Sequence, residues 1–205
     1  MKIDAVEYDE IARNVFAPIY PVIANDIKKE TKITEGTCLD VGCGGGYLGL
    51  SLAEITNLQV CLFDESPEML EIADNNISMR VLTGRVNTLC GDVHAIPLPD
   101  QSVNLIISRG SIFFWENQPQ ALREIYRVLA PGGMTFIGGG FGSPELKREI
   151  FRIMEQRDSS WRTKHQQRIN KNTPAHYDNV LQEAGLTDYT ICQTEAGFWI
   201  MIRRK

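Results

Sequence analysis

Short apolar runs alternate along the chain with segments in which apolar residues recur every three or four positions. The apolar runs predict five strands, at 37–41, 58–64, 86–92, 103–108 and 134–140. Helical spacing predicts helices between them, at 47–55, 66–77 and from 118 to a stop at Pro131. Because strands that alternate with helices imply right-handed crossovers, the pattern predicts an α/β fold with a largely parallel sheet and helices on both faces. Ligands of such sheets lie at the carboxyl ends of the strands.

The last third of the chain departs from this alternation. The segment 143–161 predicts one amphipathic helix, with apolar residues one turn apart. After a further helix at 173–186, apolar strands at 187–194 and 197–205 are separated by a very short connection. A connection this short predicts a hairpin, which is antiparallel.

Composition and charge limit the classes of protein. A length of 205 residues fits one compact domain. No apolar run approaches the roughly 18 residues of a membrane span, and the acidic start "MKIDAVEYDE" is unlike a secretory signal, so we expect a cytoplasmic protein. A net charge of −5 argues against a nucleic-acid-binding surface over the whole molecule. The five cysteines lack zinc-site spacing, which favours reduced thiols over a metal centre.

The glycine-rich turn after the first strand, "CLDVGCGGGYLGL" at 38–50, allows two interpretations. It contains a literal G-x-G-x-x-G match at 44–49, the fingerprint of a dinucleotide site. However, the strand breaks two residues earlier, at Gly42, so the match lies inside the turn. A carboxylate at the strand tip, Asp40, is also unfavourable beside a pyrophosphate. The match is therefore interpreted as an accident of a glycine run.

A cationic ligand suits the acidic residues at the strand ends better. S-adenosylmethionine carries an ammonium and a sulfonium and has no phosphate, so Asp40 is favourable beside it. Asp64 ends the second strand and is placed to accept both ribose hydroxyls. Asp92 follows the third strand and is placed to accept from the adenine amino group. The strand ends therefore predict S-adenosylmethionine as the cofactor.

Four stretches resemble a known family: "LDVGCGGG", "FDESPEML", "GDVHAIPLPDQSVNLIIS" and "ALREIYRVLAPGG". They are similar to the successive motifs of class I S-adenosylmethionine-dependent methyltransferases, in particular the type 11 group that includes the ubiquinone and menaquinone C-methyltransferases. "VFAPIYP", "SRGSIFFWE" and "GGGFG" resemble a subgroup of stand-alone prokaryotic members. The resemblance covers about residues 36–140 and, with the hairpin, nearly the whole fold.

The resemblance implies a Rossmann-like fold with a seven-stranded sheet ordered 3-2-1-4-5-7-6, in which strand 7 is antiparallel. It implies a single domain over 1–205 with four parts: an N-terminal helical cover (1–35), a cofactor-binding core (36–140), an acceptor-side helical segment (141–185) and a terminal hairpin (186–205).

The resemblance also implies the residues of the site. The expected cofactor-binding residues are Tyr20, Asp40, Gly42, Gly44, Gly46, Asp64, Glu65, Met69, Asp92, Val93 and Ser108. The expected substrate-side residues are Arg109 and Phe141, and no catalytic residue is assigned. Ser108 stands where metal-dependent catechol O-methyltransferases carry an acidic ligand, so no metal is expected. "SRGS" replaces the [DN]-P-P-[YF] motif, which disfavours the amino groups of bases or glutamine as acceptors.

Several of these residues also have a simpler structural interpretation. Asp40 suits a helix cap, and Tyr20 suits packing within the helical cover. Arg109 suits a structural salt bridge as well as substrate contact. His94, beside Asp92, is interpreted as an ordinary loop histidine in preference to a base.

The segment 145–171 is unusually basic, with eight Lys and Arg against four Asp and Glu in a chain of net charge −5. Such a run forms either solvated helix faces or, together with Arg109, a site for an anionic acceptor. The sequence thus predicts metal-independent, in-line methyl transfer from S-adenosylmethionine to a small molecule that is not a nucleic acid. The alternatives are a non-catalytic module that binds the cofactor and acts through a partner, and an NAD-dependent oxidoreductase.

Overall fold

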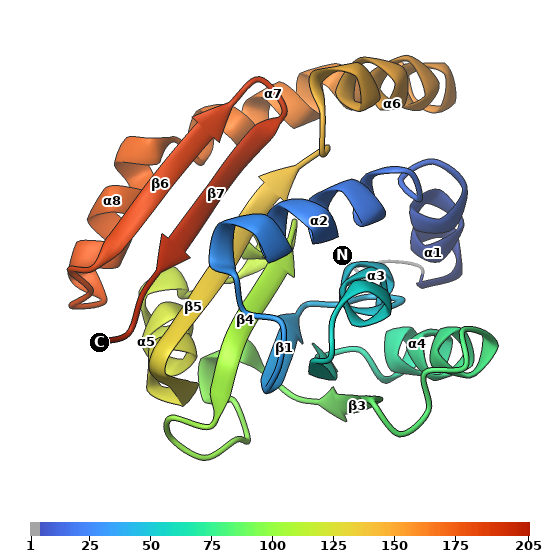
Figure 1. The fold of residues 1–205 in the computed structure, drawn as a ribbon. Coiled ribbons are helices and arrows are strands. Elements are labelled where there is room, and N and C mark those ends of the chain that lie inside the picture. Colours follow the sequence, from blue (N-terminus) through green and yellow to red (C-terminus); the bar gives the residue numbers. More distant parts are fainter. Residues whose placement is uncertain (1–4) are drawn as a thin grey trace.

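A seven-stranded sheet forms the centre of the computed structural model, which describes residues 5–205 (Figure 1). The strands are β1 (Thr37–Val41), β2 (Gln59–Asp64), β3 (Val86–Cys90), β4 (Val103–Arg109), β5 (Leu129–Gly140), β6 (Tyr189–Thr194) and β7 (Gly197–Ile202). Their order is β3-β2-β1-β4-β5-β7-β6, and β7 is antiparallel to both neighbours while the other pairs are parallel. The predicted order and the terminal hairpin are confirmed.

Eight helices surround this sheet within residues 5–205. They are α1 (Ala5–Asn14), α2 (Ile19–Thr31), α3 (Tyr47–Ile55), α4 (Pro67–Met79), α5 (Gln118–Val128), α6 (Pro144–Arg157), α7 (Trp161–Lys171) and α8 (Pro174–Glu183). Two short 3₁₀ helices, η1 (Val93–Ala95) and η2 (Ile112–Phe114), follow β3 and β4. None of the helices in the described part of the chain is long and apolar enough to cross a membrane. The first four residues of the predicted N-terminal cover lie outside the described residues.

The sheet separates two hydrophobic cores. Alternation along a strand sends successive side chains to opposite faces, so Cys38 of β1 joins one core while Leu39 and Val41 join the other. The first core also holds apolar residues of α2, α3, α4 and α6, and the second holds those of α5 and α8. Both faces are therefore covered, as the alternating pattern predicts.

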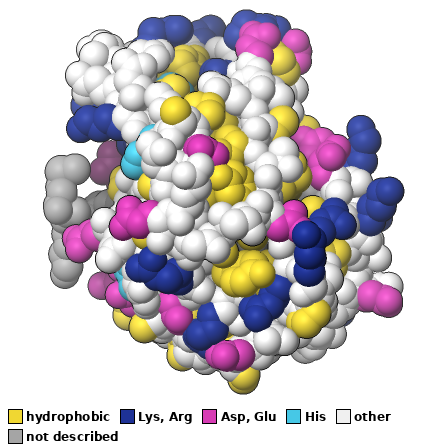
Figure 2. Space-filling model, turned by 90° about the vertical axis from the view of Figure 1, so that its left-hand side faces the viewer, with side chains coloured by type: hydrophobic (Ala, Val, Ile, Leu, Met, Phe, Trp, Pro, Cys, Tyr) yellow, Lys and Arg dark blue, Asp and Glu magenta, His cyan; other side chains and the backbone are white. Residues whose placement is uncertain are grey.

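The β6 edge of the sheet is less completely covered. Figure 2 faces this edge and shows hydrophobic side chains in the middle of the surface, with both basic and acidic side chains around them. Along β7, Phe198, Ile200 and Ile202 are buried, whereas Trp199 and Met201, which point to the opposite face, are only partly buried. The hairpin thus packs mainly through the face that contacts α8.

Local capping explains where several helices begin. Ser66 accepts a hydrogen bond from the Met69 N–H and Pro67 occupies the first position of α4, as predicted. The single helix predicted over 143–161 is instead two helices, because α6 ends at Arg157 and Asp158 has an extended backbone. The Asp158 carboxylate accepts hydrogen bonds from the N–H and hydroxyl of Ser160, which starts a new helix. Figure 1 shows α6 and α7 at the end toward which the parallel strands point.

Candidate functional site

Glycines in left-handed conformation build the turn after β1. Three of them have φ of 65°, 53° and 80°: Gly42, Gly44 and Gly46. A Cβ on Gly42 would lie 2.2 Å from the Cβ of Ser111, so no larger residue fits there. A Cβ on Gly44 would meet only the Tyr8 ring, at 3.8 Å. The turn is therefore closely packed below Gly42 and open at Gly44.

The carboxylate of Asp64 holds this turn against the start of α4. The Gly42 N–H donates to the carbonyl of Phe63, at 2.8 Å. The Gly44 N–H then donates to Asp64 Oδ2 at 2.8 Å, and the Ser66 N–H donates to Asp64 Oδ1 at 3.0 Å. Asp64 therefore accepts hydrogen bonds that hold the fold together. Because its side chain is only half-buried, it also stays accessible at the end of β2.

Asp40 lies beneath the turn and is almost inaccessible, with 2% of its surface exposed. Its Oδ2 accepts the N–H of Gly49, in the first turn of α3, at 2.9 Å. Burial raises the pKa of this carboxyl to about 7; the Gly49 N–H opposes the rise, and the charge of Asp64 adds to it. The hydrogen bond of Asp40 is therefore that of a helix cap. A nearby cation would stabilise the negative charge that this buried carboxyl carries when it is ionised.

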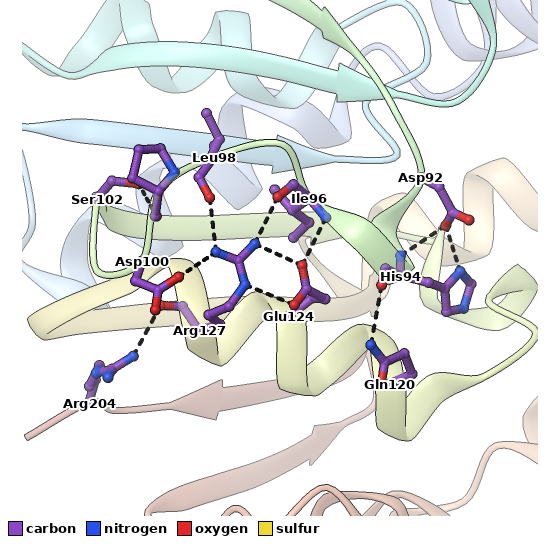
Figure 3. Close-up of polar contacts among 11 residues, drawn as sticks. Asp92, His94, Ile96, Leu98, Asp100, Ser102, Gln120, Glu124, Arg127 and Arg204 are labelled. Carbon is purple, nitrogen blue, oxygen red and sulfur yellow. Dashed lines mark hydrogen bonds and ion pairs between the residues drawn. The ribbon is translucent and has the colours of Figure 1, made fainter.

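Asp92 and His94 form a local unit after β3 (Figure 3). Asp92 Oδ1 accepts the backbone N–H of His94 at 2.8 Å and lies 2.6 Å from His94 Nδ1. The Asn117 N–H donates to His94 Nε2 at 3.2 Å, which places the imidazole proton on Nδ1. Both ring nitrogens are thus used within the fold, in agreement with the loop interpretation of His94. The next residue after Asp92, Val93, is buried.

Arg127 of α5 anchors the rest of the loop between β3 and β4 (Figure 3). Its guanidinium donates to the carbonyls of Ile96 and Leu98 at 2.8 and 2.9 Å, and to Asp100 Oδ1 at 2.7 Å. It also pairs with Glu124, whose pKa it lowers, and Glu124 Oε2 accepts the Ile96 N–H at 3.0 Å. The position of the loop that begins with Asp92 is therefore set by α5.

The N-terminal helices contact the glycine turn through aromatic and acidic residues. The Tyr47 hydroxyl at the start of α3 donates to Asp9 of α1 at 2.6 Å. Tyr20 of α2 stacks on Tyr47, with ring centroids 5.4 Å apart. The Tyr20 hydroxyl has no hydrogen-bond partner within residues 5–205, and burial raises its pKa. Tyr20 thus packs in the cover as one interpretation predicts, and its hydroxyl remains available. Sequence reasoning missed Asp9, because only the fold pairs it with Tyr47.

The remaining predicted cofactor residues differ in accessibility. Ser108 is fully buried, and its hydroxyl lies 2.6 Å from that of Ser111, which donates to the Val41 carbonyl at 3.0 Å. Met69 is buried at the start of α4, and Glu65 is exposed just before it. Ser108 therefore fastens the end of β4 to the turn through Ser111, a residue that sequence reasoning did not single out.

Arg109 lies between aromatic rings at the end of β4. Its Nε donates to the Gly140 carbonyl at 3.1 Å. The guanidinium lies 4.6 Å from the centroid of the Phe16 ring and 5.5 Å from that of Phe141. It forms no ion pair within the described chain, so the salt bridge expected as an alternative is not found there. Phe141 is buried at the end of β5, beside Arg109.

The polar groups at the strand ends fit S-adenosylmethionine better than a pyrophosphate. Residues 36–79, which hold the glycine turn, β2 and α4, contain no Lys or Arg. The groups at the strand ends are the carboxylates of Asp40, Asp64 and Asp92, which suit cations and hydroxyls. The left-handed Gly44, without a close neighbour, leaves room for a ligand to approach the backbone. Within residues 5–205, no three His, Cys, Asp or Glu side chains are grouped to hold a metal ion.

Comparisons with known proteins agree with this fit. A family model described as a methyltransferase domain matches residues 39–137. A protein from Methanococcus maripaludis, assigned to the S-adenosyl-L-methionine-dependent methyltransferases and known from its crystal structure, is 43% identical. The match covers 98% of this chain and 92% of that protein, with a TM-score of 0.95.

Two further relatives are more distant. The rice chloroplastic 2-methyl-6-phytyl-1,4-hydroquinone methyltransferase 1 is 34% identical over 102 residues, which is 49% of this chain and 30% of that protein. The [4+2]-cyclase SpnF is 29% identical, with a TM-score of 0.55, over 58% of this chain and 44% of that protein. The chain spans less than half the length of the curated relatives it matches here. On the nearly full-length match to the Methanococcus protein, and on the fold, this chain belongs to the S-adenosylmethionine-dependent methyltransferases.

Proposed function

We propose that this chain transfers the methyl group of S-adenosylmethionine to a small-molecule acceptor without the help of a metal. The observation that carries this proposal is the set of three carboxylates at neighbouring strand ends around an open glycine turn, together with the absence of Lys and Arg from residues 36–79. When bound, the cofactor supplies an electrophilic methyl group on a sulfonium. The protein's own residues position the two reactants and exclude water.

We assign the cofactor contacts by position and chemistry. Asp64 accepts the ribose hydroxyls, and Asp92 accepts from the adenine amino group through the oxygen that His94 does not use. The buried charge of Asp40 stabilises the cationic end, and the free hydroxyl of Tyr20 faces the same region. The glycines, Glu65, Met69, Val93 and Ser108 form or support the walls. We therefore propose residues 36–140 as the cofactor-binding core, under a cover whose described part consists of α1 and α2.

The acceptor side begins at Arg109 and Phe141 and continues through residues 141–185. The two residues lie at the carboxyl ends of β4 and β5, and β4 is the neighbour of β1, the strand that leads into the glycine turn. Arg109 has no acidic partner within residues 5–205, which leaves its charge available to an acceptor with an anionic group. We therefore propose a small anionic acceptor rather than a nucleic acid.

Cofactor choice is the first prediction. Isothermal titration calorimetry is expected to show S-adenosylhomocysteine binding in the micromolar range and no measurable binding of NAD. The physical reason is that carboxylates at the ends of β1 and β2 accept from hydroxyls and cations but repel a pyrophosphate. An NAD affinity equal to that of S-adenosylhomocysteine would instead support the oxidoreductase alternative.

Binding alone does not establish methyl transfer, since one relative with this fold is named as a cyclase. The direct test supplies methyl-labelled S-adenosylmethionine and a small-molecule extract and follows label into an acceptor. Label transfer by the chain alone argues against the non-catalytic alternative, whereas binding without any label transfer favours it.

Asp64→Ala is expected to weaken the binding of S-adenosylhomocysteine about 10- to 150-fold. This factor corresponds to roughly 1.5–3 kcal/mol, the scale of hydrogen bonds to a charged group. The change removes the ribose acceptor and also the group that holds Gly44 and Ser66. Calorimetry on the variant measures the loss. Asp74→Ala is the matched control, because Asp74 is an exposed acidic residue of α4 whose side chain bonds only Thr88 among residues 5–205. Equal affinities of the Asp64 variant and this control would place the ribose elsewhere.

A further inference from the structure

A cavity of about 340 Å³ lies between α7 and the β6–β7 hairpin, and we name it the α7 pocket. Its volume falls in the range of about 300–1,000 Å³ that small-molecule sites occupy. Phe141, Phe151 and Phe198 supply apolar wall, and Gly139 and Gly197 of β5 and β7 also line the pocket. Phe141 joins the pocket to Arg109 and thus to the acceptor side of the proposed active site.

The charged side chains among the described lining residues of the α7 pocket are all basic. None of its described lining residues is Asp or Glu, whereas Lys147 and Arg162 are both part of its wall. Thr173 and Pro174 also line it at the amino-terminal end of α8, where the helix dipole is positive. A pocket with positive groups and no acidic ones selects anions.

The charges of these groups are not all equally available. Arg162 forms an ion pair with Glu155 that involves two of its nitrogens, so its charge is largely compensated. Lys147 is half-buried, donates at 2.6 Å to the backbone carbonyl of Glu195, and forms no ion pair within the described residues. Arg168 and Arg109 rest on aromatic rings, likewise without an acidic partner among residues 5–205. Three cations around the pocket therefore remain uncompensated.

His165 adds a neutral polar group to the wall. Its ring stacks on Trp161 with centroids 5.2 Å apart, and lies 4.9 Å from Phe151 and 5.8 Å from Phe141. Neither ring nitrogen bonds another residue within the described part of the chain. Burial, together with the surrounding cations Lys147, Arg168, Arg109 and Arg162, lowers the pKa of its imidazole to about 4. At neutral pH the imidazole is uncharged, with one donor and one acceptor to offer.

We propose that the α7 pocket binds the methyl acceptor as an aromatic carboxylate, with its carboxylate against Lys147, its ring against Phe141 and Phe151, and His165 hydrogen-bonded to a polar group on the ring. The aromatic walls distinguish such a ligand from a simple inorganic anion, because a flat ring buries apolar surface against them. The identification of the ligand as the acceptor rests on the proposed function, whereas the anion and ring selectivity rests on the pocket alone.

The experiment measures binding of three acids, benzoate, 4-hydroxybenzoate and indole-3-carboxylate, each beside its uncharged amide, and of inorganic phosphate. The full chain is saturated with S-adenosylhomocysteine, and calorimetry gives the affinities. We expect at least one acid to bind about 10-fold or more tightly than its amide and than phosphate, as charge-assisted pairing in a partly desolvated site implies. The preference should shrink as salt is raised.

Variants connect the selectivity to the pocket. Lys147→Met is expected to abolish the preference for the acid, while Lys171→Met, an exposed lysine at the end of α7 outside the pocket, leaves it unchanged. If melting curves show that Lys147→Met does not fold, Arg168→Gln at an exposed position is expected to reduce the preference several-fold. NMR titration of His165, assigned by loss of its signals in His165→Asn, should show a higher pKa with the acid bound, because the carboxylate offsets the nearby cations. The amide should leave this pKa unchanged.

Each failure has a distinct meaning. Equal affinities of every acid and its amide, or equal effects of Lys147→Met and Lys171→Met, overturn the anion site. Phosphate that binds as tightly as the best acid overturns the aromatic part of the inference. Absence of S-adenosylhomocysteine binding overturns the proposed function instead, and in that case the same titrations without it still test the pocket.

Discussion

Gly42→Ala is expected to destabilise the protein by about 2–5 kcal/mol, the sum of two costs. A left-handed backbone costs a non-glycine residue roughly 1–2 kcal/mol, and Gly42 has φ of 65°. Overpacking costs about 1–3 kcal/mol more, because the new Cβ would lie 2.2 Å from the Cβ of Ser111. Ser111 cannot swing away cheaply, since its hydroxyl bonds both Ser108 and the Val41 carbonyl.

Urea denaturation of the variant measures this loss of stability. Gly84→Ala is the control, because it carries the backbone cost without the packing cost. Gly84 has a φ of 95°, and no atom lies within 4 Å of the position that a Cβ would take there, so only the backbone cost applies. The Gly42 variant should therefore lose more stability than the Gly84 variant. Equal losses would show that the turn and Ser111 move apart without penalty, contrary to the close packing described above.

Asp40→Asn is expected to stabilise the ligand-free protein at pH 8 by on the order of 4 kcal/mol and to weaken the binding of S-adenosylmethionine. In the folded protein burial raises the pKa of Asp40 from 3.8 to about 7. Between these values the folded state binds more protons than the unfolded state, so this carboxyl makes stability fall as pH rises from about 4 to 7. At 1.36 kcal/mol per pKa unit, ionisation of Asp40 is costly to the fold above pH 7.

Asparagine keeps the acceptor for the Gly49 N–H but does not ionise, so the pH-dependent loss disappears with it. Chemical denaturation at pH 5 and pH 8 measures the difference between variant and parent, which should grow with pH. The exposed Glu35→Gln serves as the control for removing one carboxylate. A variant that gains no stability at pH 8 would mean that Asp40 is better solvated than its burial indicates, and unchanged cofactor affinity would remove it from the cationic end of the site.

The strands, the helices and the turn after β1 followed from local patterns, whereas the order of the sheet was implied by the resemblance to the methyltransferase family. Apolar runs, helical spacing and the Ser66-Pro67 start of α4 are each encoded within a few residues, so the sequence alone predicted them. The short connection before Gly197 predicted an antiparallel hairpin for the same reason. The carboxylates at the ends of β1 and β2 were predictable because parallel strands bring their carboxyl ends to one edge.

Contacts that depend on tertiary packing were not predictable in this way. Asp9 reaches Tyr47 only because α1 folds over the turn, and nothing in its own helix distinguishes it from other surface acids. His165 occupies an apolar stripe of α7 with Trp161, one turn before it, but its surrounding cations come from three different elements. The break at Asp158 lies within the polar run 155–160, where no apolar spacing marks the point at which α6 ends.

The α7 pocket also sets an order of events during synthesis of the chain. Its wall includes Gln193, Thr194, Gly197 and Phe198 of the hairpin, whereas the glycine turn and the three acidic strand ends all lie before residue 93. The ribosome therefore completes every proposed cofactor contact of the strand ends well before it delivers the strand that closes the pocket. Because β7 must insert between β5 and β6, this closure brings together residues distant in sequence, a slow class of contact. A chain that has not yet received its hairpin therefore has the complete cofactor half while the wall of the α7 pocket is still incomplete.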